Sequence, residues 1–185
     1  MLKSTNEIVM HSYPGMVAIV TSKFEEKTNI MAAGWHTYIS YNPPIYGVAI
    51  AKERFTHNLV TCSNEFVINF LPGHLASIIQ SSGTLSGNDV DKFRELDLGY
   101  DKGETVKCPI LHDAYVAYEC KVMDIQTYGD HDWVVGEITK FHRDEDKFLE
   151  NGLPDFDKLE IPLYVGRSKY MILDKKTELK NYYHG

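Results

Sequence analysis

The chain has few cysteines, and their spacing suits neither a disulfide framework nor a zinc site. Cys62, Cys108 and Cys120 are the only three in 185 residues, and no two of them form a C-x-x-C pair. An odd number of widely spaced cysteines argues against a disulfide scaffold and against a structural zinc knuckle. We therefore expect three reduced cysteines with structural roles.

Long apolar runs and an excess of positive charge are also missing. No run approaches the roughly 18 apolar residues that span a bilayer, and the first eight residues, MLKSTNEI, lack the apolar core of a signal peptide. The formal net charge of −7 disfavours binding to nucleic acid or to an anionic membrane, because both need a basic face. We expect a cytoplasmic protein with neither partner.

The signatures of several large enzyme classes are absent from the sequence. It contains no G-x-G-x-x-G, Walker A, G-x-S-x-G or H-E-x-x-H motif, and nothing singles out a serine or cysteine nucleophile. Rossmann and P-loop nucleotide sites and a serine hydrolase are therefore unsupported. Despite eight histidines, no ligand spacing typical of a metal centre appears, so we expect no metal site.

Strand-like segments dominate what is present. Residues 16–22, 46–51 and 66–71 are apolar on both faces, which is typical of central strands. Residues 115–125 alternate instead, and residues 133–141 continue that pattern after the turn Tyr128-Gly129-Asp130, so we expect a long hairpin. In its first strand we expect one half-exposed face, made of Ala117, Glu119 and Lys121.

Helical segments are few and short. We predict helices over residues 55–62, 75–81 and 90–96, with Thr56 capping the first and Asn88 or Asp89 capping the third. They do not alternate regularly with the strands. The pattern favours a β-barrel with helical insertions over a parallel α/β sheet.

Length and composition indicate a single domain over residues 1–185. A chain of this size with 43% hydrophobic residues can bury one core. Residues 144–160 are acidic and contain Gly152 and Pro154, so we expect a surface excursion there. A C-terminal tail is expected from about residue 174 to residue 185.

The segment from Asn29 to Asn58 is the most informative for function. The small residues at 32–34 leave room for a flat ring to lie on the backbone, whose N–H and C=O groups can hydrogen-bond its edge. Lys52, Arg54 and the N–H groups near Thr56 suit a phosphate, because the N-terminus of a helix attracts anions. The order predicts a site for a flat aromatic ligand with a phosphate tail.

Other interpretations of this segment stay open at this point. The small residues could equally pack a strand against its neighbour, and Trp35 could belong to the core. Lys52 and Arg54 could be solvated surface charges. His57 and Asn58 are secondary candidates for contact with a phosphate.

A histidine lies at the predicted tip of the long hairpin, in the run Gly129-Asp130-His131-Asp132. A histidine in such a turn is usually just exposed. As a functional group, His131 could contact an incoming ligand above a bound ring, or change the charge near it by titrating close to neutral pH.

Six motifs follow one another along the chain, between about Tyr13 and Phe141. They are Pro14-Gly15 and residues 29–35, 40–44, 66–71, 86–93 and 129–131. Taken in this order, they resemble the flavin reductase-like family of FMN-binding split β-barrel proteins, which includes flavoredoxins.

The resemblance implies a Greek-key split β-barrel that works as a homodimer, with FMN in a groove at or near the subunit interface. The isoalloxazine would lie along residues 29–33 and 49–51, and the phosphate would meet Lys52, Arg54 and Thr56. His131 would be the catalytic residue beside the nicotinamide. The implied FMN-binding residues are Asn29, Ile30, Met31, Ala32, Ala33, Trp35, Ala49, Ile50, Ala51, Lys52, Arg54, Thr56 and His57.

The function implied is that of an FMN-dependent oxidoreductase. It would take a hydride from NADH or NADPH and pass electrons to free flavin, ferric iron or a partner protein. Two alternatives remain: an FMN-binding electron-transfer module that does not turn over NAD(P)H, and a barrel that has lost its cofactor and serves as an interaction domain.

Overall fold

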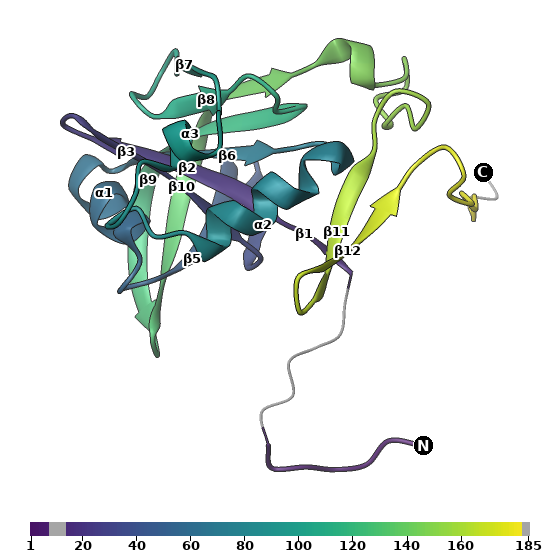
Figure 1. Cartoon of the computed structure of the whole chain (residues 1–185), viewed down its shortest axis with the longest axis horizontal. Helices are drawn as coiled ribbons and strands as arrows, with labels where there is room; N and C mark the ends of the chain where they lie inside the picture. The colour runs from purple at the N-terminus through teal and green to yellow at the C-terminus, as the bar shows by residue number, and fades with distance from the viewer. Residues whose placement is uncertain (8–13, 183–185) are drawn as a thin grey trace.

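The computed structural model describes residues 1–7 and 14–182, and its central element is a seven-stranded antiparallel sheet (Figure 1). The order across the sheet is β3-β2-β6-β9-β10-β5-β4. The prediction of a mainly β fold with short helices is confirmed. The strands are β2 (Ala18–Phe24), β3 (Lys27–Ala33), β4 (His36–Tyr41), β5 (Pro44–Ala51), β6 (Glu65–Phe70), β9 (Val116–Tyr128) and β10 (His131–Arg143).

The sheet curls into a barrel because its two edge strands are consecutive in the chain. Strand β3 ends at Ala33 and β4 begins at His36, so only Gly34 and Trp35 connect the two edges. A residue spans at most about 3.6 Å. The two edges therefore meet at this connection, where the backbone N–H of Ala49 donates to the carbonyl oxygen of Trp35 (2.9 Å) and continues the pairing of β4 with β5 by one residue.

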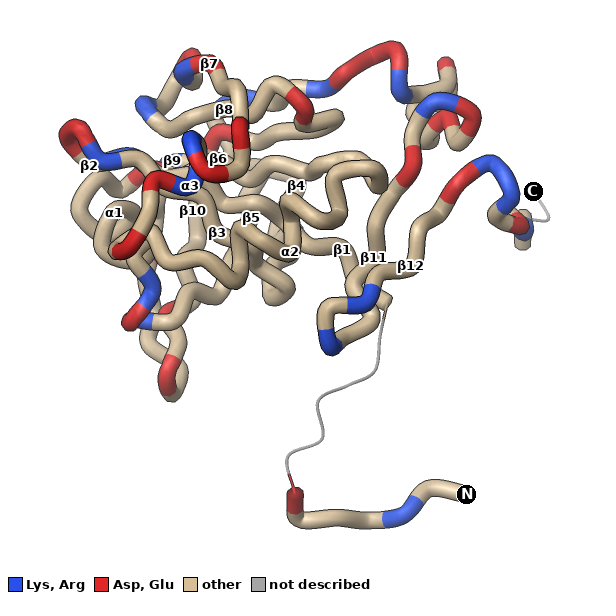
Figure 2. Tube along the Cα trace, viewed as in Figure 1, with Lys and Arg blue, Asp and Glu red and all other residues tan. Residues whose placement is uncertain are grey.

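Two smaller sheets flank the barrel. Strands β1 (Gly15–Met16), β11 (Ile161–Gly166) and β12 (Lys169–Leu173) form one, and β7 (Tyr100–Lys102) and β8 (Pro109–Leu111) form the other. Residues 144–160 are mostly exposed, as expected of a surface excursion. Figure 2 shows that charged residues gather in this excursion and in the loops, whereas most of the barrel strands are uncharged.

In the described part of the chain, three short α-helices and two 3₁₀ turns interrupt the strands. The turns are η1 (Gly73–Leu75) and η2 (Glu145–Lys147). The helices are α1 (Phe55–Ser63), α2 (Ala76–Thr84) and α3 (Lys92–Glu95).

Both predicted helix caps are wrong. Helix α1 follows Arg54 with no side-chain cap, and Thr56 is buried one residue inside the helix. Helix α3 is capped by Asp91, whose carboxylate accepts from the N–H groups of Phe93 and Arg94. Asn88 and Asp89 cannot take that role because the helix begins only at Lys92, and they belong to the preceding turn, in which the N–H of Asp89 donates to the carbonyl oxygen of Ser86.

Apolar side chains fill the barrel and also cover part of its outside. Val20, Phe66 and Val134 belong to the inner core, whereas Ile19 and Ile30 point outward and pack against α2. Strands β2 and β3 are thus buried on both faces, which explains the continuous apolar runs in their sequences.

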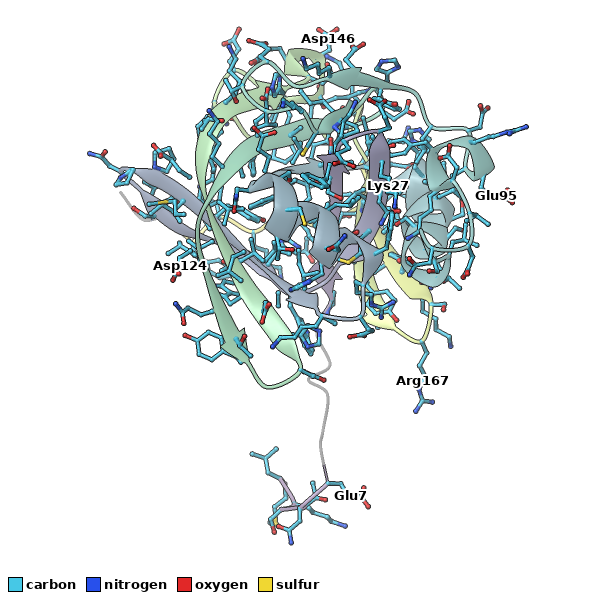
Figure 3. All side chains as sticks on the ribbon, turned by 90° about the vertical axis from the view of Figure 1, so that its left-hand side faces the viewer. Glu7, Lys27, Glu95, Asp124, Asp146 and Arg167 are labelled. Carbon is cyan, nitrogen blue, oxygen red and sulfur yellow. The ribbon has the colours of Figure 1, made fainter. Side chains whose placement is uncertain are left out.

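The expected exposed face of the long hairpin is wrong for the first half of β9. Ala117 and Glu119 are buried rather than half exposed. The segment from Gly103 to Cys108 lies over them, with Cys108 and Val106 packed against Ala117. Beyond this cover the hairpin is exposed on its outer side and extends past the barrel, where Asp124 points outward (Figure 3).

The other expectations about organisation have mixed outcomes. All three cysteines are free, but Cys62 is exposed and therefore not part of the core. Among the described residues, no helix is long and apolar enough to cross a bilayer. Tyr13, where the resemblance begins, and residues 183–185 of the expected tail lie outside the described residues.

Candidate functional site

A small pocket opens where α1 begins, and we call it the basic pocket. It has a volume of about 110 Å³. Strand β3, the start of α1, the end of α2 with the loop after it, and α3 all contribute. Its lining residues are Asn29, Met31, Glu53, Arg54, Phe55, Thr56, residues 82–87 and Lys92.

The loop after α2 is held close to β3 at Gly87. A Cβ atom built on Gly87 would lie 2.5 Å from Oδ1 of Asn29 and 2.5 Å from Cδ1 of Phe55. Any side chain would therefore push the loop away from the start of α1. Glycine at this position keeps the basic pocket narrow.

Asn29 and Thr56 form the floor of the basic pocket. Nδ2 of Asn29 donates to Oγ1 of Thr56 (2.8 Å), and both residues are buried. Because the Thr56 oxygen accepts this bond, its own proton is left to donate to another group. The two residues predicted from the sequence to bind a ligand are thus in direct contact, although they are 27 positions apart.

Lys92 adds a buried positive charge that the sequence analysis did not assign to the site. Its Nζ donates to the carbonyl oxygens of Ile30 (2.9 Å) and Ser82 (2.7 Å). Among the ion pairs of residues 14–182, none involves Lys92. Burial, and then the nearby charge of Arg54, lowers the pKa of Lys92 to about 8.

The sequence carried one signal for Lys92. The run Asp91-Lys92-Phe93 places a lysine between a helix cap and a core phenylalanine, at the buried start of a helix. A lysine is almost never fully buried without a reason. The expected burial of the neighbouring Phe93 could therefore have indicated that Lys92 is buried for a functional reason.

Arg54 contributes the second positive charge of the basic pocket. Its side chain is about half exposed, and Nε lies 3.8 Å from a carboxylate oxygen of Glu53, which is itself mostly exposed. Such a long, solvated ion pair holds the guanidinium weakly. Arg54 is therefore free to turn toward an anion in the pocket.

Lys52 and His57 lie outside the basic pocket and surround Asp132. Nε2 of His57 lies 2.7 Å from Oδ2 of Asp132, and Nζ of Lys52 lies 3.5 Å from Oδ1. Thr127 donates to Oδ1 (2.7 Å). The hydrogen bond with His57 and then that from Thr127 lower the pKa of Asp132. This network joins α1 to the β9–β10 hairpin. The predicted contacts of Lys52 and His57 with a ligand stay predictions.

A second pocket, which we call the aromatic pocket, opens beside the hairpin tip. It has a volume of about 470 Å³. The His131 ring lies against that of Trp35, with centroids 4.9 Å apart and planes 50° apart. Nδ1 of His131 lies 2.7 Å from Oδ1 of Asp130 and donates to it, which leaves Nε2 for another partner. The lining residues are Trp35, Ala49, Tyr128, Asp130, His131 and Trp133.

The same two stretches of chain border both pockets. Strand β3 and its continuation run from Asn29 to Trp35, and β5 with the turn after it runs from Ala49 to Thr56. Six residues of strand span roughly 20 Å. The small-residue strand and the basic turn therefore reach both pockets. We call the path from Asn29 to Trp35 the track, and its use as one groove for a ligand stays a prediction.

Several residues of the predicted ligand groove offer only their backbone to a ligand. The side chains of Ile30, Ala33 and Ile50 are buried in the two cores, and that of Ala51 is buried as well. The carbonyl oxygen of Ile30 is already bonded to Lys92. These four residues can therefore contact FMN only through their backbone atoms. That they do so stays a prediction.

Among the described residues, no three His, Cys, Asp or Glu side chains are close enough to hold a metal ion. The donors of the basic pocket are instead Lys92, Arg54, the Thr56 hydroxyl and the amide of Asn29. This set suits an anion with several oxygen acceptors, such as a phosphate.

Comparison with known proteins agrees with the fold and the motifs. The model of the flavin reductase like domain family matches residues 10–174, so the match continues past Phe141 through the acidic excursion. An uncharacterised protein of Pyrococcus abyssi is 32% identical over 164 residues, which are 89% of this chain and 93% of that protein.

Two solved structures are similar over nearly the whole chain. An FMN-binding protein of Thermus thermophilus is 33% identical with a TM-score of 0.86, and the similarity covers 97% of this chain and 100% of that one. Flavoredoxin of Desulfovibrio vulgaris is 25% identical with a TM-score of 0.85, covering 99% and 98%. The chain belongs to the flavin reductase-like domain family and has its split β-barrel fold.

Proposed function

We propose that the chain binds FMN and transfers electrons from NADH or NADPH through it to an acceptor. The phosphate would occupy the basic pocket, and the ring system would lie along the track from Asn29 to Trp35. Free flavin, ferric iron and a partner protein are the acceptors we consider. The FMN-binding protein and the flavoredoxin among the similar structures support a flavin ligand.

The observation that carries this proposal is the set of positive charges and donors in the basic pocket. Lys92 has three N–H donors and uses two of them on backbone carbonyls, so one remains for a ligand. At the start of α1 the N–H of His57 donates to the carbonyl oxygen of Arg54, whereas the N–H groups of Phe55 and Thr56 precede the first helical bonds and can attract an anion. A phosphate oxygen can accept from these groups, from the Thr56 hydroxyl and from Arg54.

When bound, FMN supplies the hydride and electron chemistry, so no acid or base of the protein is obligatory. The chain's own residues hold and orient the ligands. Asn29, through its bond to Thr56, fixes the position of the hydroxyl that would donate to the phosphate. His131, whose Nδ1 is held by Asp130, would contact the nicotinamide through Nε2.

Titration with FMN tests the first part of the proposal. We expect saturable quenching of flavin fluorescence. If no saturable quenching occurs, the chain has lost its cofactor and the proposal fails.

Anaerobic mixing of the FMN-loaded protein with NADH and with NADPH tests the second part. We expect bleaching of the flavin absorbance by at least one of them. Bound FMN that neither nicotinamide reduces, but that a reduced protein donor does reduce, would show an electron-transfer module instead.

His131→Ala should slow the reduction of FMN by the nicotinamide more than it weakens FMN binding. An unchanged rate of reduction would remove His131 from the site.

We also propose that the chain works as a homodimer. Tyr41 and Phe141 are at least half exposed, and contacts through the rings of Tyr38 and Tyr118 connect them into one aromatic surface. Large exposed aromatic surfaces are favoured at interfaces between proteins. Light scattering should give twice the mass of the chain, and Tyr41→Glu should shift the protein toward the monomer.

A further inference from the structure

A cavity separate from both pockets lies between the surface excursion at residues 144–160 and the barrel, and we call it the excursion cavity. Its volume of about 550 Å³ is within the range of sites for small molecules. The turn η1, the loop before β9, the excursion and the loop after β12 line it. It shares no lining residue with the basic pocket or the aromatic pocket, and Figure 1 shows α1 and β11 on opposite sides of the molecule.

Hydrogen bonds between distant segments hold the walls of the excursion cavity in place. Where the excursion begins, the N–H of Asp144 donates to the carbonyl oxygen of Tyr115 (3.0 Å). Where it ends, the carbonyl oxygen of Glu160 accepts from the N–H of Gly73 (2.8 Å). A Cβ atom on Gly73 would lie only 2.8 Å from that of Glu160, so η1 and the end of the excursion are in close contact. The cavity is therefore preformed in the ligand-free fold.

Tyr115 lines the excursion cavity, and its hydroxyl group lacks a partner. Only 6% of the residue is exposed, and its ring packs beside Phe70 and Phe148. Within residues 1–7 and 14–182, the hydroxyl makes no hydrogen bond. Burial raises the pKa of Tyr115, so the phenol keeps its proton as a donor. A buried donor without an acceptor is costly, and a ligand in the cavity can supply the acceptor.

The carboxylates at the excursion cavity are mostly free to bind a ligand. Those of Asp113, Asp157 and Glu160 have no ion-pair partner in the described part of the chain. Asp144 and Asp174 add two more, and each uses one oxygen to accept from a backbone N–H of its own loop. A concave surface with an excess of carboxylates attracts cations.

The fold already uses two of the three lysines at the cavity. Nζ of Lys147 donates to the carbonyl oxygen of Lys158 (3.2 Å), and Nζ of Lys158 lies 3.4 Å from Oδ2 of Asp155. Lys175 completes the set. With neutral histidines, five carboxylates and three lysines give the lining a formal charge of −2. The cavity therefore favours a cation over an anion.

We propose that the excursion cavity binds a small alkyl amine that also carries an uncharged oxygen, such as an amino alcohol. Its ammonium group lies among the unpaired carboxylates, and its oxygen accepts the hydrogen bond from the hydroxyl of Tyr115. The alkyl chain between them packs on Phe156 and Leu159, which form an apolar part of the lining. This site does not depend on the proposed function, because it is separate from both pockets assigned to FMN and the nicotinamide.

Isothermal titration calorimetry of the full chain with 4-amino-1-butanol tests the proposal. Three compounds of similar length serve as comparisons: 1,4-butanediol is uncharged, 4-hydroxybutyrate carries the opposite charge, and butylamine lacks the oxygen. Salt at about 0.15 M screens unspecific attraction to exposed carboxylates. We expect saturable binding at an affinity about tenfold or more above that of 1,4-butanediol, as a hydrogen bond to a charged group implies. The anion should not saturate.

Tyr115→Phe removes only the hydroxyl and keeps the ring. It should weaken binding of 4-amino-1-butanol about 3- to 10-fold and leave that of butylamine nearly unchanged. The variant should fold with an unchanged or higher Tm, since it loses an unpartnered buried donor. Asp157→Asn combined with Glu160→Gln should weaken binding of both amines. The matched control is Asp146→Asn, an exposed carboxylate of the same excursion that does not line the cavity (Figure 3).

Equal affinities for the amino alcohol and the diol, saturable binding of 4-hydroxybutyrate, or no binding of the amine up to about 10 mM would overturn the site. An unchanged affinity or a lower Tm in Tyr115→Phe would overturn it as well, because the hydroxyl would then have another partner. FMN affinity, read from flavin fluorescence, should be the same with and without the amine. A chain that binds the amine but no FMN keeps this site and loses the proposed function, and the reverse result does the opposite.

Discussion

Lys92 and Glu119 are both buried charged side chains, and they differ in how fully their neighbours satisfy them. The carboxylate of Glu119 accepts five hydrogen bonds, which come from His142, the N–H groups of Glu104, Thr105 and Val106, and the Thr105 hydroxyl. The ammonium of Lys92 donates to two carbonyl oxygens and lies at a pocket.

The pKa values of the two groups follow from this difference. Burial alone would raise the pKa of Glu119, but the hydrogen bonds from His142 and Thr105 outweigh it and lower the pKa to about 2. For Lys92 the loss of hydration is not compensated, and the pKa falls to about 8. The fold stabilises the charge of Glu119 and destabilises that of Lys92.

We therefore expect the saturated buried charge of Glu119 to have a structural role and the unsaturated charge of Lys92 to lie at a binding site. Glu119 holds the loop at 104–106 over β9, where that loop covers the outer face of the barrel. Lys92 retains a donor that an anion can use. The predictions below test this distinction, from the largest expected effect to the smallest.

Glu119→Gln should lower the free energy of unfolding by about 3 to 5 kcal/mol, the range for breaking a buried charge pair by removing one partner. Urea denaturation measures this loss, with exposed Glu137→Gln as the matched control.

The stability should also depend on pH. Because the pKa of Glu119 in the folded protein lies below the ordinary 4.5, its contribution to the free energy of unfolding is present above about pH 4.5 and is lost as the pH falls toward 2. The variant should lack this dependence and bind FMN normally. A loss of unfolding free energy below about 1 kcal/mol would contradict the structural role of Glu119 and with it the contrast to Lys92.

Lys92→Met should weaken FMN binding by about 1.5 to 3 kcal/mol, the range for a hydrogen bond to a charged group. Fluorescence titration measures the affinity, and exposed Lys102→Met is the control. The unfolding free energy of the flavin-free protein should change far less than in Glu119→Gln, since the fold stabilises this charge poorly. A large loss of stability with unchanged FMN affinity would reverse the comparison and make Lys92 structural.

Arg54→Ala should weaken FMN binding by about 1 to 2 kcal/mol, less than Lys92→Met, because the guanidinium is half exposed and its contacts are screened by water. The control is Arg94→Ala, an exposed arginine on α3 that does not line the basic pocket. Raising the salt concentration should weaken FMN binding in the wild type more than in Arg54→Ala. An unchanged affinity would remove Arg54 from the phosphate site.

Local patterns in the sequence predicted the strands and the two ends of the track. Apolar runs placed β2, β5 and β6, and the turn at Gly129-Asp130 placed the long hairpin, because these signals depend only on neighbouring residues. The family resemblance placed Asn29, Arg54 and Thr56 in one site, and the three residues do line one pocket. That this pocket binds a ligand stays a prediction.

Contacts between distant segments were beyond such patterns. The burial of Glu119 depends on a loop about 15 residues earlier, which alternation within β9 cannot reveal. Lys92 reaches β3 across 62 positions, and His57 turns to Asp132 across 75. Thr56 is not the cap of α1 because the helix begins one residue earlier, and its hydroxyl instead accepts a hydrogen bond from Asn29 of β3.

The pH dependence of FMN affinity is the smallest expected effect and tests Lys92 most directly. A phosphate beside the ammonium favours its charged form, so binding raises a pKa that is about 8 in the free protein. The complex then holds a proton that the free protein loses above pH 8, and affinity must fall as the pH rises through that value. Between pH 7 and 9 the loss should approach about tenfold at most, since one proton is linked. The phosphate itself, with a second pKa near 6, stays a dianion over this range.

In Lys92→Met the FMN affinity should be nearly constant between pH 7 and 9, because the titrating ammonium is gone. A wild-type affinity that is also constant would show that Lys92 does not face the phosphate, whatever its effect on affinity at neutral pH.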